Sequence, residues 1–296
     1  MRGPGVTLGV DLGGTKALAS AWRGGREVWS GARPTGRGLG PAACLRLVAD
    51  LVGAASREAP VDRLGIGFPG LVEPGTGRVR SSVILDGWDH VPLAAQLEER
   101  TGCSTLVDND VNNAARAEVA TRAVAGAPAD DLLFVAVGTG IGGALVLRGR
   151  VWPGVAGLAG EVGHMTAGGS EVRCDCGGTG CVCLQASGRS MGDALGVSAE
   201  DLPVILAGAA SAASAVLERA AARLGAVVAD AMNLLNLPLV VLGGGVAEQP
   251  GFVDLVDRAF RSSAMPEVAA VCRVEPARAG YSAGARGAVL LADEDR

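Results

Sequence analysis

Two glycine-rich turns of the same design constrain this chain more than any other feature. Residues 6–22 read VTLGVDLGGTKALASAW, and residues 133–147 read LFVAVGTGIGGALVL. Each stretch is an apolar run, a glycine turn and a second apolar run, which predicts two antiparallel strands joined by a tight turn. Because the copies lie about 125 residues apart, the sequence predicts an internally duplicated fold.

Helical and extended patterns alternate along the rest of the chain. This alternation predicts α/β layers, and the length of 296 residues allows one or two domains. We expect helices near Pro41–Ala59, Leu93–Thr101, Val111–Val124, Ala209–Leu235 and Ser282–Ala292, and further strands at Leu64–Phe68, Ser104–Val107 and Leu239–Leu242.

Charge and hydropathy exclude several classes of function. The net charge is −5 and the basic residues are dispersed, so we expect no nucleic-acid partner. The uncharged run of residues 132–147 is too short and too rich in glycine to span a membrane. The first residues also lack the pattern of a signal peptide, so we expect a cytoplasmic protein, in which disulfides are rare.

Glycine turns at the ends of strands can hold phosphate groups, because their backbone N–H groups approach anions closely. A third such turn, LGGGV, follows the expected strand Leu239–Leu242. A carboxylate before the first turn could orient a hydrated Mg²⁺, although a plain hairpin turn explains each glycine pattern equally well. The candidate nucleotide-binding residues are Asp11, Gly13, Gly14, Thr15, Lys16, Gly138, Thr139, Gly140, Gly243, Gly244 and Gly245.

The stretch VDNDVNNAARAE, residues 107–118, gathers acids and amides where a strand meets a helix. Asp and Asn are preferred helix caps, but a helix needs only one cap. A carboxylate here could accept a proton from a hydroxyl group while the amides bind neighbouring hydroxyls. The spacing alone supports both interpretations.

Four of the seven cysteines lie within CDCGGTGCVCLQ, residues 174–185. A four-sulfur metal site, a disulfide knot, and three ligands plus a separate cysteine are all conceivable. His164, one of two histidines, lies ten residues before Cys174, so the histidine and the cysteines together suffice for a tetrahedral zinc site.

In this order, DLGGTK, GIGFPG, VDNDVNNA, VGTGIGGALV, GLAGEVGH, CDCGGTGC and ASG resemble the ROK sugar kinases, the bacterial glucokinase-like branch of the actin-like ATPase fold. The resemblance implies an α/β, two-lobed fold with a cleft, internal duplication and a zinc-binding loop. It also implies ATP and Mg²⁺ as cofactors, phosphoryl transfer to the primary hydroxyl of a sugar, and a homodimer. We expect a small domain from residues 1–108 plus 282–296, and a large domain from residues 109–281 that carries the zinc site.

The resemblance also assigns roles to single residues. It implies that Asp110 is the catalytic base. It also implies that the residues contacting the substrate are Gly70, Asn109, Asp110, Glu161 and His164. The implied zinc ligands are His164, Cys174, Cys176 and Cys181.

Two positions depart from the family pattern. Cys183 stands where the family usually has a glutamate that receives sugar hydroxyls, and Ile84 stands where it tends to have an asparagine. Losing both acceptors favours a modified hexose, such as an amino sugar, or a hexose-derived cyclitol. Water or a neighbouring group could instead replace them and leave glucose as substrate, and zinc could exchange one ligand for Cys183.

The family also contains sugar-sensing regulators without catalytic activity. These carry an added DNA-binding segment at the N-terminus, whereas here the first strand begins about six residues from Met1. We therefore expect a kinase acting on a small sugar-like molecule, with the regulator as the alternative.

Overall fold

The computed structural model describes residues 5–36, 38–169, 171–198, 201–207 and 211–294. It divides into two compact units, one drawn from Met1–Pro128, Pro153–Leu158 and Ala279–Arg296, the other from Ala129–Trp152 and Ala159–Arg278. The division into functional domains that the sequence suggested stays a prediction. No helix among the described residues has both the length and the apolar character needed to cross a lipid bilayer.

The first unit is built on a five-stranded sheet in the order β3-β2-β1-β4-β8. Strands β1, β2 and β3 form an antiparallel meander, whereas β4 and β8 run parallel to β1. The strands are β1 (Val6–Leu12), β2 (Lys16–Arg23), β3 (Arg26–Pro34), β4 (Val61–Phe68) and β8 (Ser104–Asn109). A small separate antiparallel sheet contains β5 (Leu71–Glu73), β6 (Arg78–Ser81) and β7 (Asp89–Val91).

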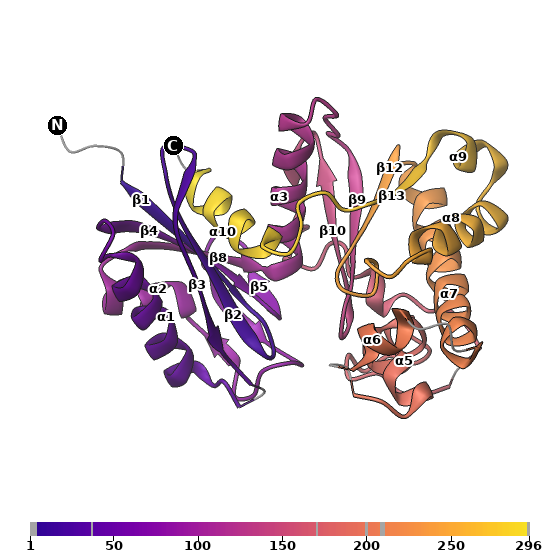
Figure 1. Ribbon diagram of the computed structural model, residues 1–296, viewed down its shortest axis with the longest axis horizontal. Helices are drawn as coiled ribbons and strands as arrows, with labels where there is room; N and C mark the ends of the chain where they lie inside the picture. The colour runs from indigo at the N-terminus through magenta and orange to yellow at the C-terminus, as the bar shows by residue number, and fades with distance from the viewer. Residues whose placement is uncertain (1–4, 37, 170, 199–200, 208–210, 295–296) are drawn as a thin grey trace. The chain divides into compact units, whose positions relative to one another are not determined.

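Helices cover both faces of the first sheet (Figure 1). The helices are α1 (Pro41–Ala55), α2 (Leu93–Thr101), α3 (Asp110–Val124) and α10 (Ala283–Asp293). Because successive strand residues point to opposite faces, Leu8 and Val10 enter the core shared with α1 and α2, while Gly9 faces α10. Helix α3 packs against α10.

Helix α10 approaches the first sheet so closely that only glycine fits beneath it. A Cβ on Gly9 or Gly65 would collide with backbone carbonyl oxygens of α10, those of Ala285 and Ala288 respectively. The two strand positions therefore lack side chains so that the helix backbone can rest directly on the sheet.

The second unit repeats the topology of the first sheet. Its order is β11-β10-β9-β12-β13, with β9, β10 and β11 antiparallel and β12 and β13 parallel to β9. The strands are β9 (Leu132–Val137), β10 (Ile141–Leu147), β11 (Arg150–Val151), β12 (Leu239–Gly243) and β13 (Arg273–Pro276). The same strand order with the same directions confirms the internal duplication predicted from the two glycine turns.

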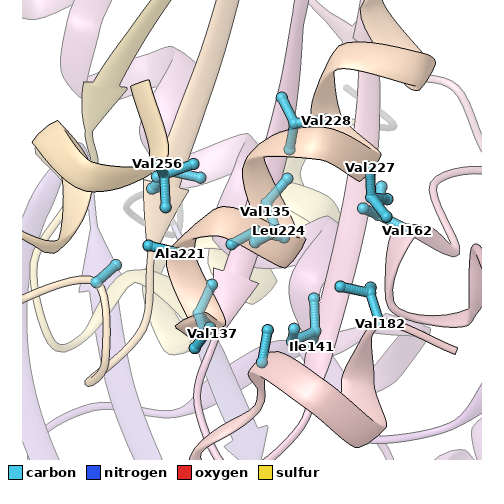
Figure 2. Close-up of a cluster of buried hydrophobic side chains, with 14 of the residues drawn as sticks. Val135, Val137, Ile141, Val162, Val182, Ala221, Leu224, Val227, Val228 and Val256 are labelled. Atoms are coloured by element: carbon cyan, nitrogen blue, oxygen red, sulfur yellow. The ribbon is translucent and has the colours of Figure 1, made fainter. Parts of the chain in front are cut away.

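The core of the second unit lies between its sheet and the long helix α7. Ala221, Leu224 and Val228 of this helix face Val135 of β9, and Val256 comes from a neighbouring helix (Figure 2). The helical elements are η1 (Val162–His164), α4 (Cys183–Ala186), α5 (Gly188–Leu195), α6 (Leu202–Ala207), α7 (Ser211–Leu235), α8 (Phe252–Ser263) and α9 (Pro266–Val271).

The elements expected from the sequence are present, with shifted ends. Helix α2 has the predicted bounds, whereas α1 ends at Ala55 rather than Ala59. Ala209, where the long helix was expected to begin, lies outside the described residues. The sequence interpretation did not identify β3, the small sheet or α8.

Two glycine substitutions should change the stability of the protein in opposite directions. Gly65→Ala should lower the free energy of unfolding by about 1–3 kcal/mol, because the new Cβ forces the Ala288 carbonyl away. Gly53→Ala, on the exposed side of α1 with open space around it, should raise it by up to about 1 kcal/mol. Urea denaturation followed by circular dichroism measures both, and equal stability of Gly65→Ala and wild type would contradict the packing argument.

Candidate functional site

The first glycine turn is held in place by Thr35, the residue that follows β3. Within the turn, the Gly13 N–H donates to the Lys16 carbonyl at 2.9 Å. Thr35 donates its hydroxyl to the Gly13 carbonyl at 2.7 Å and its N–H to the Thr15 carbonyl at 2.9 Å. The Lys16 ammonium lies 4.6 Å from the centre of the Tyr281 ring. Thr35 is too far along the chain for the sequence interpretation to have linked it to the turn.

Asp11 lies near the end of β1, directly beside the start of α10. A Cβ on Gly284, in the first turn of that helix, would overlap the Asp11 carboxylate. Burial raises the pKa of Asp11 to about 6. Ionisation of this buried carboxylate is unfavourable in the free protein. A bound cation would offset the unfavourable desolvation of the charge, so Asp11 is well suited to a cation partner.

Helix α3 begins at the cluster of acids and amides. The Asn109 side-chain oxygen caps the helix, accepting from the N–H groups of Val111 at 2.8 Å and Asn112 at 3.3 Å. Its Nδ2 donates to the Gly70 carbonyl at 3.1 Å, which ties the loop after β4 to the helix. Asp110 is the first residue of α3, where the helix dipole stabilises a negative charge.

The second carboxylate of the cluster, Asp108, already has protein partners. Arg116 lies 2.6 Å from its Oδ2, and the Asn112 amide donates to its Oδ1 at 2.9 Å. Arg116 also contacts Glu294 at 3.1 Å. Asp108 therefore has a structural role, while the Asp110 carboxylate accepts from the Val111 N–H at 2.9 Å. The sequence interpretation missed Arg116, because Asp108 lies on β8 and Arg116 on α3, so no helical spacing links the two.

Ser82 organises the loop that follows the small-sheet strand β6. Its hydroxyl donates to the Pro69 carbonyl at 2.6 Å and accepts from the N–H groups of Ile84 at 3.1 Å and Leu85 at 3.0 Å. The Ile84 side chain lies against Gly14, 3.1 Å from where a Cβ on that glycine would stand. The position that lacks the expected amide thus carries an apolar contact with the first glycine turn.

The other two glycine turns lie side by side in the second unit, where β9 and β12 end. Gly244 has a φ of +88°, which favours glycine, and a Cβ there would collide with the Val137 backbone. The Gly138 carbonyl accepts from the Gly188 N–H of α5 at 2.7 Å, and the Thr139 carbonyl accepts from the Arg189 N–H at 3.1 Å. The start of α5 therefore fixes the turn between β9 and β10.

Glu161 directly precedes η1 in the second unit, and His164 is the last residue of η1. The His164 Nε2 is 3.9 Å from a Glu161 carboxylate oxygen. Burial raises the pKa of Glu161, and the neighbouring His164 partly offsets this effect. The Nδ1 of His164 points the other way, 3.6 Å from the Cys174 sulfur. One histidine therefore joins a carboxylate to the cysteine cluster.

The ligand atoms of His164, Cys174, Cys176 and Cys181 all lie within 4.8 Å of one another. The Cys176 and Cys181 sulfurs are 3.6 Å apart. Tetrahedral bonds of about 2.3 Å to sulfur and about 2.05 Å to nitrogen require sulfur–sulfur separations of about 3.8 Å and sulfur–nitrogen separations of about 3.6 Å. The donor set and its spacing therefore fit Zn²⁺.

Cys183 also points toward this cluster. Its sulfur is 3.7 Å from that of Cys174, and its half-buried side chain packs against the core of the second unit. The chain thus has one more sulfur at the cluster than a tetrahedral site with a histidine requires.

The comparisons with known proteins agree with these motifs. The model of the ROK family matches residues 7–295. A glucokinase from Halalkalibacterium halodurans is 32% identical, over 95% of this chain and 92% of its own. An N-acetylmannosamine kinase from Escherichia coli is also 32% identical, over 97% of this chain and 98% of its own.

Among solved structures, this chain resembles a ROK family glucokinase from Streptomyces griseus in complex with glucose and AMPPNP. The TM-score is 0.85 and the sequence identity 28%, over 98% of this chain and all of the other. The actin-like ATPase fold expected from the sequence is confirmed.

The cysteine cluster predicts one zinc ion per chain. Cys176→Ser should lose the metal, because a serine hydroxyl replaces one of three thiolate ligands. Cys103→Ser is the matched control, since Cys103 is buried outside the cluster and its hydrogen bond to the Val61 carbonyl suits a hydroxyl. Elemental analysis of purified proteins gives the zinc content, and a metal-free wild type or a zinc-loaded Cys176→Ser would contradict the assignment.

The raised pKa of Asp11 predicts a pH-dependent stability. Between about pH 4 and 6 the folded protein keeps the Asp11 proton after the unfolded chain has lost it, so the free energy of unfolding falls as pH rises. Asp11→Asn should remove this loss of stability. It should raise the free energy of unfolding by up to about 3 kcal/mol at pH 7.5 and by little below pH 4. Denaturation without Mg²⁺ and nucleotide tests this, and an equal effect at both pH values would argue against it.

Proposed function

Because this chain belongs to the ROK family, we propose that it is an ATP-dependent kinase that phosphorylates the primary hydroxyl of a glucose-like hexose. The kinase names of the two curated relatives and the AMPPNP bound in the Streptomyces griseus glucokinase support this proposal. They also favour a kinase over a sugar-sensing regulator. A homodimer and a cytoplasmic location stay predictions.

The observation that carries the proposal is the placement of Asp110. It is the first residue of α3, next to Asn109, whose amide holds the Gly70 loop. In the proposed reaction Asp110 accepts the proton of the sugar hydroxyl as its oxygen attacks the γ-phosphorus of ATP. The phosphorus–oxygen bond to ADP breaks as the new bond forms.

The glycine turns would bind the phosphates through backbone N–H groups. In the first unit this is the turn Gly13–Lys16, with Asp11 beside it as the candidate partner of hydrated Mg²⁺. In the second unit it is the pair of turns Gly138–Gly140 and Gly243–Gly245, which lie where β9 and β12 end. When bound, Mg²⁺ neutralises the phosphate charge that develops during transfer.

Glu161 and His164 would bind sugar hydroxyl groups. With Nδ1 of His164 bound to a metal, its Nε2 carries the proton and donates toward Glu161 or a hydroxyl. A zinc ion at this site would thus set the tautomer of His164, the residue proposed to bind a sugar hydroxyl.

The preferred substrate is proposed to be a modified hexose or a hexose-derived cyclitol. The Cys183 sulfur turns to the cysteine cluster, and Ile84 packs against Gly14, so neither position supplies a strong hydrogen-bond acceptor. A hydroxyl that relied on either acceptor in glucose would lose a hydrogen bond. A ligand that lacks or substitutes that hydroxyl avoids this loss.

Asp110→Asn should lower kcat by about 10²–10⁴-fold, because the amide cannot accept the proton, while KM changes much less. The matched control is Asp89→Asn, whose carboxylate is 91% exposed and lies on β7. Steady-state kinetics with coupled detection of ADP measure both variants. Wild-type turnover in Asp110→Asn would remove this residue from the role of base.

Cys183→Glu should raise kcat/KM for glucose and lower it for the preferred substrate. Each restored hydrogen bond to a charged acceptor is worth about 1.5–3 kcal/mol, or roughly 10–150-fold in specificity. ATP consumption with glucose, amino sugars, N-acetyl sugars and cyclitols first identifies that substrate. If wild-type protein already uses glucose as efficiently as a dedicated glucokinase, Cys183 does not determine the substrate preference.

A further inference from the structure

The cysteine cluster contains a sulfur that the proposed metal site does not use. His164, Cys174, Cys176 and Cys181 supply four ligand atoms, and Cys183 places a fifth donor 3.7 Å from the Cys174 sulfur. This distance is van der Waals contact between two sulfur atoms. Cys183 starts α4, while Cys174 lies in the loop before it.

We propose that Cys174 and Cys183 are an oxidation site, at which a hydroperoxide converts the two sulfurs into a disulfide and the zinc is released. The proposal concerns Cys183 and the loop of residues 174–181, here called the metal loop, and does not depend on the kinase activity. It assigns Cys183 a role that neither the metal site nor the sugar site gives it.

The chemistry requires a thiol that is not bound to the metal. Metal binding keeps the Cys174 sulfur as a thiolate, which attacks the peroxide oxygen to give a sulfenic acid. The Cys183 sulfur then attacks the oxidised sulfur and forms the disulfide. In sum, one thiolate, one thiol and one hydrogen peroxide give a disulfide, water and hydroxide, with two electrons passing from the sulfurs to the oxygen–oxygen bond.

The geometry favours this pair over one between two ligands. In the metal-bound site every ligand sulfur would be coordinated to the metal, whereas the Cys183 sulfur could attack without first dissociating from the metal. Closing the sulfur–sulfur distance from 3.7 Å to about 2.05 Å requires only a small movement. The segment from Asp175 to Thr179 is exposed, so a small peroxide reaches the loop from solvent, and no α-helix or long strand restrains Cys174.

Loss of Cys174 from the metal would leave two thiolates and a histidine. Such a set binds zinc more weakly than four ligands do, so the ion is released. The released site also frees Nδ1 of His164, which removes the constraint on its tautomer. Oxidation of the loop would thereby reach the residue beside Glu161.

The test uses the zinc-loaded, full-length protein and hydrogen peroxide. Zinc release is followed with a chromogenic chelator, and disulfides are mapped after alkylation with a protease that cleaves before aspartate. Cleavage before Asp175 separates Cys174 from Cys176, Cys181 and Cys183. A bond between Cys174 and Cys183 therefore links two fragments, whereas one between Cys176 and Cys181 closes a loop within a single fragment.

We expect linked fragments in the wild type, with fragmentation spectra placing the bond at Cys183. Cys183→Ser and Cys183→Ala should bind zinc as the wild type does but release it about tenfold more slowly under peroxide. A thiol reductant with added Zn²⁺ should restore the wild-type site. Cys103→Ser, outside the cluster, should release zinc at the wild-type rate.

Three results would overturn the proposal. The first is a disulfide between Cys176 and Cys181 in the oxidised wild type. The second is zinc release from both Cys183 variants at the wild-type rate. The third is the absence of zinc from both variants as purified, which would make Cys183 a metal ligand instead.

Discussion

The close contact between α10 and the first sheet is the constraint on which the first unit depends. The helix backbone rests on β1 and β4 because Gly9 and Gly65 present no side chains to it. The same helix begins beside Asp11 and, at Gly287, packs against the Asn113 carbonyl of α3. One helix therefore fixes both the strand that leads into the first glycine turn and the helix that carries the proposed base. Any residue larger than glycine at these contacts would separate the layers.

The parallel strands explain why distant motifs converge within each unit. Strands β1, β4 and β8 end at the same edge of the first sheet. Asp11, the Gly70 loop and Asp110 therefore lie at neighbouring strand ends. In the second unit, β9 and β12 likewise bring two glycine turns together. Open α/β sheets bind ligands at the carboxyl ends of their strands for this reason. The duplication supplies each unit with its own set of backbone donors.

The metal loop follows a different physical logic. It is short, largely exposed and without α-helix, so apolar burial cannot hold it in one conformation. Metal coordination can hold the loop in one conformation, because only the folded arrangement of ligands gains the free energy of metal binding. The same dependence makes the loop sensitive to the oxidation state of its sulfurs, and through His164 it reaches the carboxylate of Glu161.

The sequence by itself determined the elements and motifs that depend on neighbours along the chain. Apolar periodicity placed α2 from Leu93 to Thr101, and the glycine turns revealed the duplication, since both signals are local. Only the tertiary structure decided which groups meet across long separations. Arg116 lies 3.1 Å from Glu294, 178 residues later in the chain, and the Asp11 carboxylate lies against Gly284 of α10. These contacts are set by how sheets and helices pack, and local propensity carries no information about that packing.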